Sequence, residues 1–127
     1  MTAAAFDFAG ARVLVIGASR AGIGAAIARA FRAAGAEVAI TGVEEAPAEE
    51  DRGRFAYRRL DVTDGGAVQA LAEGLGDLDV LVSGAAITAR GEEMEPAFFA
   101  RVIDVNLQGT FRAALAFRPG LARRRGC

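Results

Sequence analysis

A run of four apolar residues, 13–16, leads directly into a turn with three glycines and then into a helical pattern that ends at Gly35. The turn, residues 17–24, reads G-A-S-R-A-G-I-G. This order predicts a buried strand, a tight turn and a helix. A helix that begins at such a turn presents free backbone N–H groups and the positive end of its dipole, so the turn predicts a site for an anion such as a phosphate.

Each glycine suits one task in a dinucleotide-binding turn. Gly17 can form the tight turn, Gly22 lets a pyrophosphate approach the backbone, and Gly24 lets the helix pack closely on the strand. Apolar residues at three- and four-residue spacing predict a helix stripe that faces the sheet: Ile23, Ile27, Ala30, Phe31 and Ala34. Gly35 suits the left-handed position that follows a helix. The alternative is a turn that only joins a strand to a helix.

Length and composition predict one globular domain over residues 1–127, since 53% of the residues are apolar and the net charge is −1. No apolar run reaches the ~20 residues of a membrane helix, and no signal peptide is recognisable, so we expect a cytoplasmic protein. The single cysteine, Cys127, excludes an intrachain disulfide and a cysteine-based metal site, and we predict no metal site.

The chain has no histidine and no lysine, and Tyr57 is its only tyrosine. All fifteen basic residues are arginines, which stay protonated at working pH. The groups available for proton transfer are therefore carboxylates, one phenol and one thiol.

Further apolar segments predict three more strands, at 38–41, 55–60 and 78–82. Helices are predicted from Thr63 or Asp64 to about Leu75, from Pro96 onward, and over 105–117 with an end near Pro119. The strand at 78–82 is apolar enough to be covered on both faces. The order predicts an α/β fold, an open parallel sheet of about four strands flanked by helices.

Two segments lack such patterns. Residues 42–53 predict a solvated loop with at most a short helix, because they are rich in acidic residues and alanine. Residues 118–127 hold four arginines and no acid. We expect a disordered, solvated tail there, and the alternative is a segment that attracts nucleic acid or acidic lipid. No aromatic residue interleaves the charges, so we expect neither a nucleic-acid nor a membrane partner.

Four segments together resemble one family. The turn at 17–24 resembles the pattern T-G-x-x-x-G-x-G, and the pair D-V at 61–62 resembles the acidic site that meets an adenine ring. Residues 81–87, L-V-S-G-A-A-I, resemble L-V-N-N-A-G-I, and residues 103–111, I-D-V-N-L-Q-G-T-F, resemble V-N-L-x-G-x-F. On these segments the chain is similar to the short-chain dehydrogenase/reductase family, NAD(P)-dependent oxidoreductases with a Rossmann fold.

The resemblance implies a dinucleotide site at these positions: Gly17, Ser19, Arg20, Gly22, Ile23, Gly24, Asp61, Val62 and Ala85. Ser83 and Gly84 replace two family asparagines and Ala86 replaces a glycine. Asn106 matches an asparagine that helps a proton relay in the family. The alternative is a polar residue that satisfies the backbone at a helix break.

Two departures from the family affect the expected activity. Four residues, not three, separate Gly17 from Gly22, and Ile16 replaces a threonine, so we expect weak dinucleotide binding that depends on the turn. The family's catalytic serine and Y-x-x-x-K pair lie on later segments than this chain contains. Tyr57 has no lysine three residues later and cannot replace that pair. We therefore expect a truncated coding sequence, the cofactor-binding half of an oxidoreductase.

The choice of cofactor depends on charges near the turn. A ribose-binding acid is expected about 20 residues beyond the turn, where Glu44 and Glu45 stand, but no acid ends the strand itself. Arg20 can pair with the 2′-phosphate of NADP, so we expect NADP in preference to NAD. The alternative is that Arg20 is an ordinary surface residue.

The family's reaction is hydride transfer between NAD(P)H and a carbonyl or alcohol, and we expect a small-molecule substrate only for a full-length form. Two other functions remain open from the sequence. One is a nucleotide-binding or regulatory module without catalysis. The other is an interaction protein that uses the helix at 105–117 or an exposed sheet edge, and that edge also predicts self-association.

Overall fold

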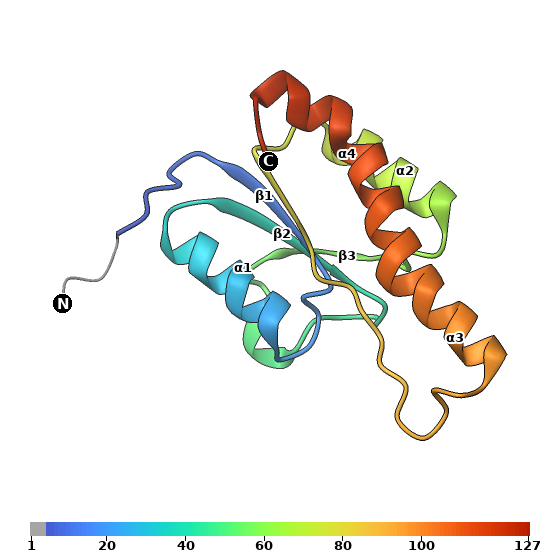
Figure 1. Ribbon diagram of the computed structural model, residues 1–127. Helices are drawn as coiled ribbons and strands as arrows, with labels where there is room; N and C mark the ends of the chain where they lie inside the picture. Colours follow the sequence, from blue (N-terminus) through green and yellow to red (C-terminus); the bar gives the residue numbers. More distant parts are fainter. Residues whose placement is uncertain (1–4) are drawn as a thin grey trace.

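The computed structural model describes residues 5–127, and its four parallel strands form one sheet in the order β3-β2-β1-β4 (Figure 1). The strands are β1 (Arg12–Ile16), β2 (Glu37–Gly42), β3 (Ala56–Arg59) and β4 (Val80–Ser83). The helices are α1 (Ile23–Ala33), α2 (Gly65–Leu75), α3 (Pro96–Ile103) and α4 (Gly109–Arg124), with the short 3-10 turn η1 (Glu49–Asp51) and the π-helical segment η2 (Asp104–Gln108). The predicted α/β fold with an open parallel sheet is confirmed.

The central strand β1 supplies both halves of the core. Val13 and Val15 pack on the face that α1 covers, whereas Leu14 and Ile16 pack on the face that α2 and α4 cover (Figure 1). All four side chains are buried. Alternate side chains of a strand point to opposite faces, so an unbroken apolar run is what a strand between two helical layers requires.

Helix α1 packs on the sheet through part of the predicted stripe and through two alanines outside it. Its buried residues are Ala25 and Ala28, and Ile27 and Phe31 are partly buried against the same cluster. Ile23 is 82% exposed and Ala30 is exposed as well, so the prediction was wrong for these two positions. Small alanine side chains let the helix axis approach the sheet, and that approach sets which face is buried.

The ends of the first two helices follow the predictions from sequence. Gly35 has a left-handed backbone with φ of +94° and follows Ala34, the C-cap residue of α1. Helix α2 is capped by Asp64, whose carboxylate accepts a hydrogen bond from the backbone N–H of Ala67 at 2.9 Å. The loop before β3 contains only the short turn η1, as predicted.

The last helix continues beyond its predicted end, and the expected disordered tail is wrong. Helix α4 runs to Arg124 with Pro119 inside it (Figure 1). Arg123 and Arg124 form ion pairs with Asp77 and Asp79 at 2.7 and 2.9 Å. These acids precede β4 and lie far away in sequence, so the local sequence of the tail does not reveal its partners. The ion pairs and the packing of the helix on the core compensate for the backbone hydrogen bond that proline cannot donate.

Strand β4 is an edge strand, and its apolar side chains are half-buried instead of covered as predicted. The end of the chain begins to pair with this edge. The Cys127 N–H donates to the Asp79 carbonyl at 2.9 Å, and the Leu81 N–H donates to the Cys127 carbonyl at 2.8 Å. At the opposite edge, β3 carries the exposed Arg58 and Arg59, charges of the kind that discourage pairing with another sheet.

Within residues 5–127, every helix is too short or too polar to cross a lipid bilayer.

A buried carboxylate joins α1 to the loop between β2 and β3. Asp51 is fully buried and accepts hydrogen bonds from Arg29 at 2.8 and 2.7 Å. Arg29 also pairs with the exposed Glu50 at 2.6 Å. The hydrogen bonds from Arg29 lower the pKa of the Asp51 carboxyl, and burial opposes that shift. At neutral pH the ionised pair therefore holds the loop between β2 and β3 against α1 through Arg29.

We expect Asp51→Asn to lower the unfolding free energy by about 1–3 kcal/mol at neutral pH, because the charge-assisted hydrogen bonds are lost. The pKa of Asp51 is lower in the folded chain than the unfolded value of about 4, so the ionised carboxylate stabilises the fold above about pH 4. This stability is lost as the pH falls through the pKa of Asp51 in the folded chain. When the pH is lowered from neutral to below about 4, the unfolding free energy of Asp51→Asn should therefore fall by less than that of the unsubstituted chain. Urea titrations at several pH values measure both effects. Glu50→Gln is the matched control, and an equal loss in that variant contradicts the assignment to Asp51.

Candidate functional site

A cleft of about 620 Å³ lies at the carboxyl ends of the strands. It is lined by the segments that follow β1, β2, β3 and β4, by the start of α1, and by residues of α3 and η2. In the sheet, β2 and β4 lie on opposite sides of β1, which makes this end a topological switch point, where α/β proteins bind ligands. All nine residues predicted to bind the cofactor line this one cleft: Gly17, Ser19, Arg20, Gly22, Ile23, Gly24, Asp61, Val62 and Ala85.

Two glycines let backbone segments approach where a side chain would collide. Gly17 has a left-handed backbone with φ of +83°, and a Cβ there would lie 2.5 Å from the backbone nitrogen of Ala85. A Cβ on Gly24 would collide with the carbonyl oxygen of Gly17. Gly17 thus brings the turn against the exit of β4, and Gly24 brings α1 against the turn.

Gly22 differs from these two glycines, because a Cβ there would have open space around it. Its backbone is extended, so any residue could adopt its conformation. Gly22 precedes α1, which has no side-chain cap and no acidic residue in its first turn. The first N–H groups of the helix have no intrahelical acceptor and adjoin the cleft. This is the arrangement that binds a phosphate at a helix N-terminus.

The glycine turn is anchored in its first half and exposed in its second half. The first half is held by backbone hydrogen bonds, because the Ala18 N–H donates to the Thr41 carbonyl at 2.8 Å and the Ala48 N–H donates to the Ser19 carbonyl at 2.7 Å. Residues 20–22 are exposed. The start of the turn is therefore fixed to β2 and to the loop that follows it.

Glu44 places a carboxylate in the cleft beside the turn. The Ser19 hydroxyl donates a hydrogen bond to this carboxylate, and the Arg20 guanidinium forms an ion pair with it. The side chain of Glu44 is 24% exposed and that of Arg20 is 80% exposed. The hydrogen bond from Ser19 is the main cause that lowers the pKa of Glu44, and the charge of Arg20 adds to it. We did not assign Glu44 to the site from sequence, although its distance from the glycine turn was the available signal.

Tyr57 supports the same loop from β3. Its hydroxyl donates a hydrogen bond to the Glu44 carbonyl at 2.6 Å. Burial raises the pKa of the Tyr57 phenol, with a smaller contribution from the charge of Glu44. The phenol is therefore a neutral donor that holds the backbone of Glu44.

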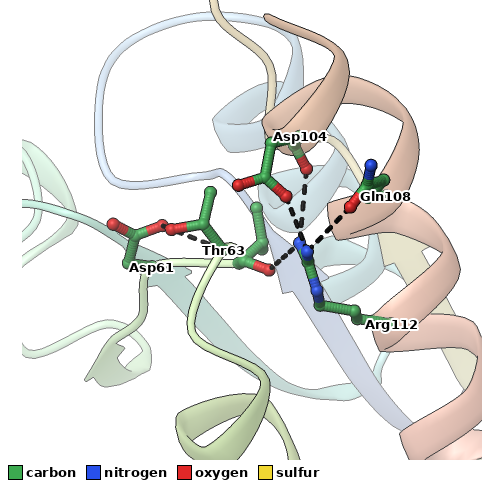
Figure 2. Close-up of polar contacts among 6 residues, drawn as sticks. Asp61, Thr63, Asp104, Gln108 and Arg112 are labelled. Carbon is green, nitrogen blue, oxygen red and sulfur yellow. Dashed lines mark hydrogen bonds and ion pairs between the residues drawn. The ribbon is translucent and has the colours of Figure 1, made fainter. Parts of the chain in front are cut away.

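The far end of the cleft follows β3. Asp61 accepts hydrogen bonds from the backbone N–H of Thr63 at 2.9 Å and from the Thr63 hydroxyl at 2.7 Å (Figure 2). These bonds lower the pKa of the Asp61 carboxyl, and the charges of Arg101 and Arg112 lower it further. A carboxylate in this setting is ionised at neutral pH and can accept a hydrogen bond from a ligand.

Asn106 lies in η2 and does not line the cleft. Its side-chain amide accepts a hydrogen bond from the Ile87 N–H at 2.8 Å and donates one to the Ile87 carbonyl at 2.9 Å. Ile87 does line the cleft, just after β4. The amide therefore satisfies both backbone groups of Ile87, which agrees with the structural alternative considered for Asn106. The role in a proton relay stays a prediction.

A family model described as enoyl-(acyl carrier protein) reductase matches residues 17–127. The chain belongs to the short-chain dehydrogenase/reductase family. It is 41% identical over 111 residues to a cis-4-hydroxycyclohexanecarboxylate dehydrogenase from Sinomonas cyclohexanicum, a match that covers 77% of this chain and 45% of the relative. It is 36% identical over 121 residues to a D-threitol dehydrogenase from Mycolicibacterium smegmatis, with 84% and 46% covered.

Solved structures agree with this assignment. The ligand-free aldohexose dehydrogenase of Thermoplasma acidophilum aligns with a TM-score of 0.81 and 32% identity, over 91% of this chain and 46% of that one. A short chain dehydrogenase/reductase family protein aligns with a TM-score of 0.83 and 30% identity, over 95% and 54%. The chain spans about half the length of the curated relatives it matches.

Proposed function

We propose that residues 1–127 form the NAD(P)-binding part of a short-chain dehydrogenase/reductase. The proposed reaction of a full-length form is hydride transfer from NAD(P)H to the carbonyl of a small molecule, or from the corresponding alcohol to NAD(P)+. The observation that carries the proposal is the glycine turn, which presents the uncapped start of α1 and the open side of Gly22 to the cleft. The cofactor diphosphate would bind there, and the adenine would lie toward Asp61 and Val62.

We expect Gly22→Val to weaken NAD(P) binding by at least about tenfold, a loss of about 1.4 kcal/mol, because the side chain occupies the space through which a diphosphate reaches the backbone. Calorimetric titration of the 127-residue chain with NAD and NADP measures the effect. The substitution should leave the fold intact, since nothing lies within 4 Å of a Cβ at Gly22. Gly74→Val in α2 is the control, because a Cβ at Gly74 has equally open surroundings. Unchanged affinity in Gly22→Val contradicts the phosphate site.

The ion pair between Arg20 and Glu44 bears on the choice between NADP and NAD. We predict NADP from sequence because Arg20 can pair with a 2′-phosphate. Arg20 is, however, already paired with Glu44, and the Glu44 carboxylate is the more buried partner. A carboxylate at this point accepts hydrogen bonds from ribose hydroxyls and repels a phosphate. We therefore propose that the unsubstituted chain binds NAD more tightly than NADP, and that removal of the Glu44 charge releases Arg20 for NADP.

Glu44→Gln should shift the ratio of the two affinities toward NADP by about tenfold, because the substitution removes one charge that faces the 2′-position. Titration of the unsubstituted chain and of Glu44→Gln with NAD and with NADP measures the ratio of the two affinities. Glu45→Gln is the matched control, since Glu45 is 85% exposed and pairs with Arg59 outside the cleft. A ratio that favours NADP in the unsubstituted chain contradicts the proposal and supports the original prediction from Arg20.

A second candidate function, a module for protein interaction, is favoured by the groove at the β4 edge. The groove has a volume of about 550 Å³ and lies between β4 and α4, with mainly apolar walls that include Leu81, Ala114 and Leu121. The end of the chain already bonds to Asp79 and Leu81, but the rest of this apolar edge strand can recruit further strands. We expect concentration-dependent self-association of the chain, on the order of tens of micromolar, in light scattering. A monodisperse monomer over that range contradicts it.

A further inference from the structure

We propose that Arg112 is a positioning residue for the adenine end of the cofactor cleft. It holds the loop after β3, residues 61–63, in the shape that receives the adenosine. The proposal rests on the proposed function, because it concerns the same cleft. Arg112 itself does not line the cleft, so any effect on a ligand acts through the groups that it holds, which are the loop after β3 and Asp104.

The guanidinium of Arg112 connects two segments that are far apart in sequence. One nitrogen donates to the Val62 carbonyl at 3.2 Å and is 3.4 Å from the Asp104 carbonyl. The other donates to the Asp104 carboxylate at 2.6 Å and to the Gln108 side chain at 3.0 Å (Figure 2). Arg112 therefore joins the loop after β3 to η2. The planar fork of arginine can serve these acceptors together, which a lysine ammonium cannot do equally well.

Val62 is also fixed on its side-chain side. The side chain is buried, and a Cβ on Gly109 would lie 2.5 Å from its Cγ2 atom. Gly109 therefore leaves the space in which Val62 packs. Packing restrains the side chain of Val62 and the Arg112 hydrogen bond restrains its carbonyl, so two contacts with one helix set the position of the loop.

The restraint matters for a ligand because both neighbours of Val62 line the cleft. Asp61 and Thr63 are linked by their own hydrogen bonds and would move together with the Val62 backbone. The positive charge of Arg112 also helps to keep the Asp61 carboxylate ionised. Loss of the guanidinium should thus displace a ligand-facing carboxylate and leave the glycine turn at the other end of the cleft unchanged.

The test compares two probes that occupy different ends of the cleft. AMP probes the adenine end and inorganic pyrophosphate probes the glycine turn. We expect Arg112→Met to bind AMP about tenfold more weakly, roughly the worth of one charge-assisted hydrogen bond, and to bind pyrophosphate within about twofold of the unsubstituted chain. Arg112→Lys should also weaken AMP binding and leave pyrophosphate binding nearly unchanged, with a smaller loss of AMP affinity. This variant replaces Arg112→Met in the test if the methionine variant does not fold.

Arg123→Met is the matched control. Arg123 lies on the same helix and forms an ion pair of similar length, 2.7 Å, with Asp77, but near the amino ends of the strands. Its AMP affinity should stay unchanged. An AMP affinity in the Arg112 variants equal to that of the unsubstituted chain overturns the positioning role, as does an equal loss for AMP and pyrophosphate. If the unsubstituted chain binds neither probe, the proposed function itself is overturned.

Discussion

Close contact between three stretches of backbone, made possible by Gly17 and Gly24, underlies the whole cleft. A side chain on Gly24 would strike the Gly17 carbonyl, and a side chain on Gly17 would strike the backbone at Ala85. The turn is therefore pressed between the start of α1 and the exit of β4. This packing brings the uncapped helix end to the switch point of the sheet, where the segments after the other strands also converge.

The parts of the fold that sequence reasoning predicted correctly are those set by local interactions. The apolar run of β1, the Asp64 cap and the left-handed Gly35 each follow from neighbouring residues. The errors concern long-range contacts. Helix α4 passes through Pro119 because distant residues stabilise its last turns. The buried face of α1 depends on how closely its alanines approach the sheet, which no periodicity reveals.

In the candidate site, too, the residues in local motifs were predicted and those that depend on long-range contacts were not. Its glycines and the Asp61–Val62 pair were predicted from motifs, and they line one cleft. Glu44 and Arg112 were not assigned to the site, because their importance depends on contacts that only the folded chain makes. Glu44 meets Ser19 and Arg20 from a different strand end, and Arg112 reaches the Val62 carbonyl across fifty positions of sequence. Spacing along the chain points to the region of Glu44 but not to its contacts with Ser19 and Arg20, and it gives no sign of Arg112.

The most direct test of the account is a map of backbone amide chemical shifts during titration of the 127-residue chain with NAD. If the cofactor binds in this cleft, the largest changes occur at Gly22, Ile23 and Gly24, with further changes at Asp61 and Ala85. Residues at the opposite end of the sheet, such as Gly76 and Gly126, should remain unaffected. An absence of changes at the glycine turn, or changes centred on the β4 edge, would contradict a cofactor site in this cleft.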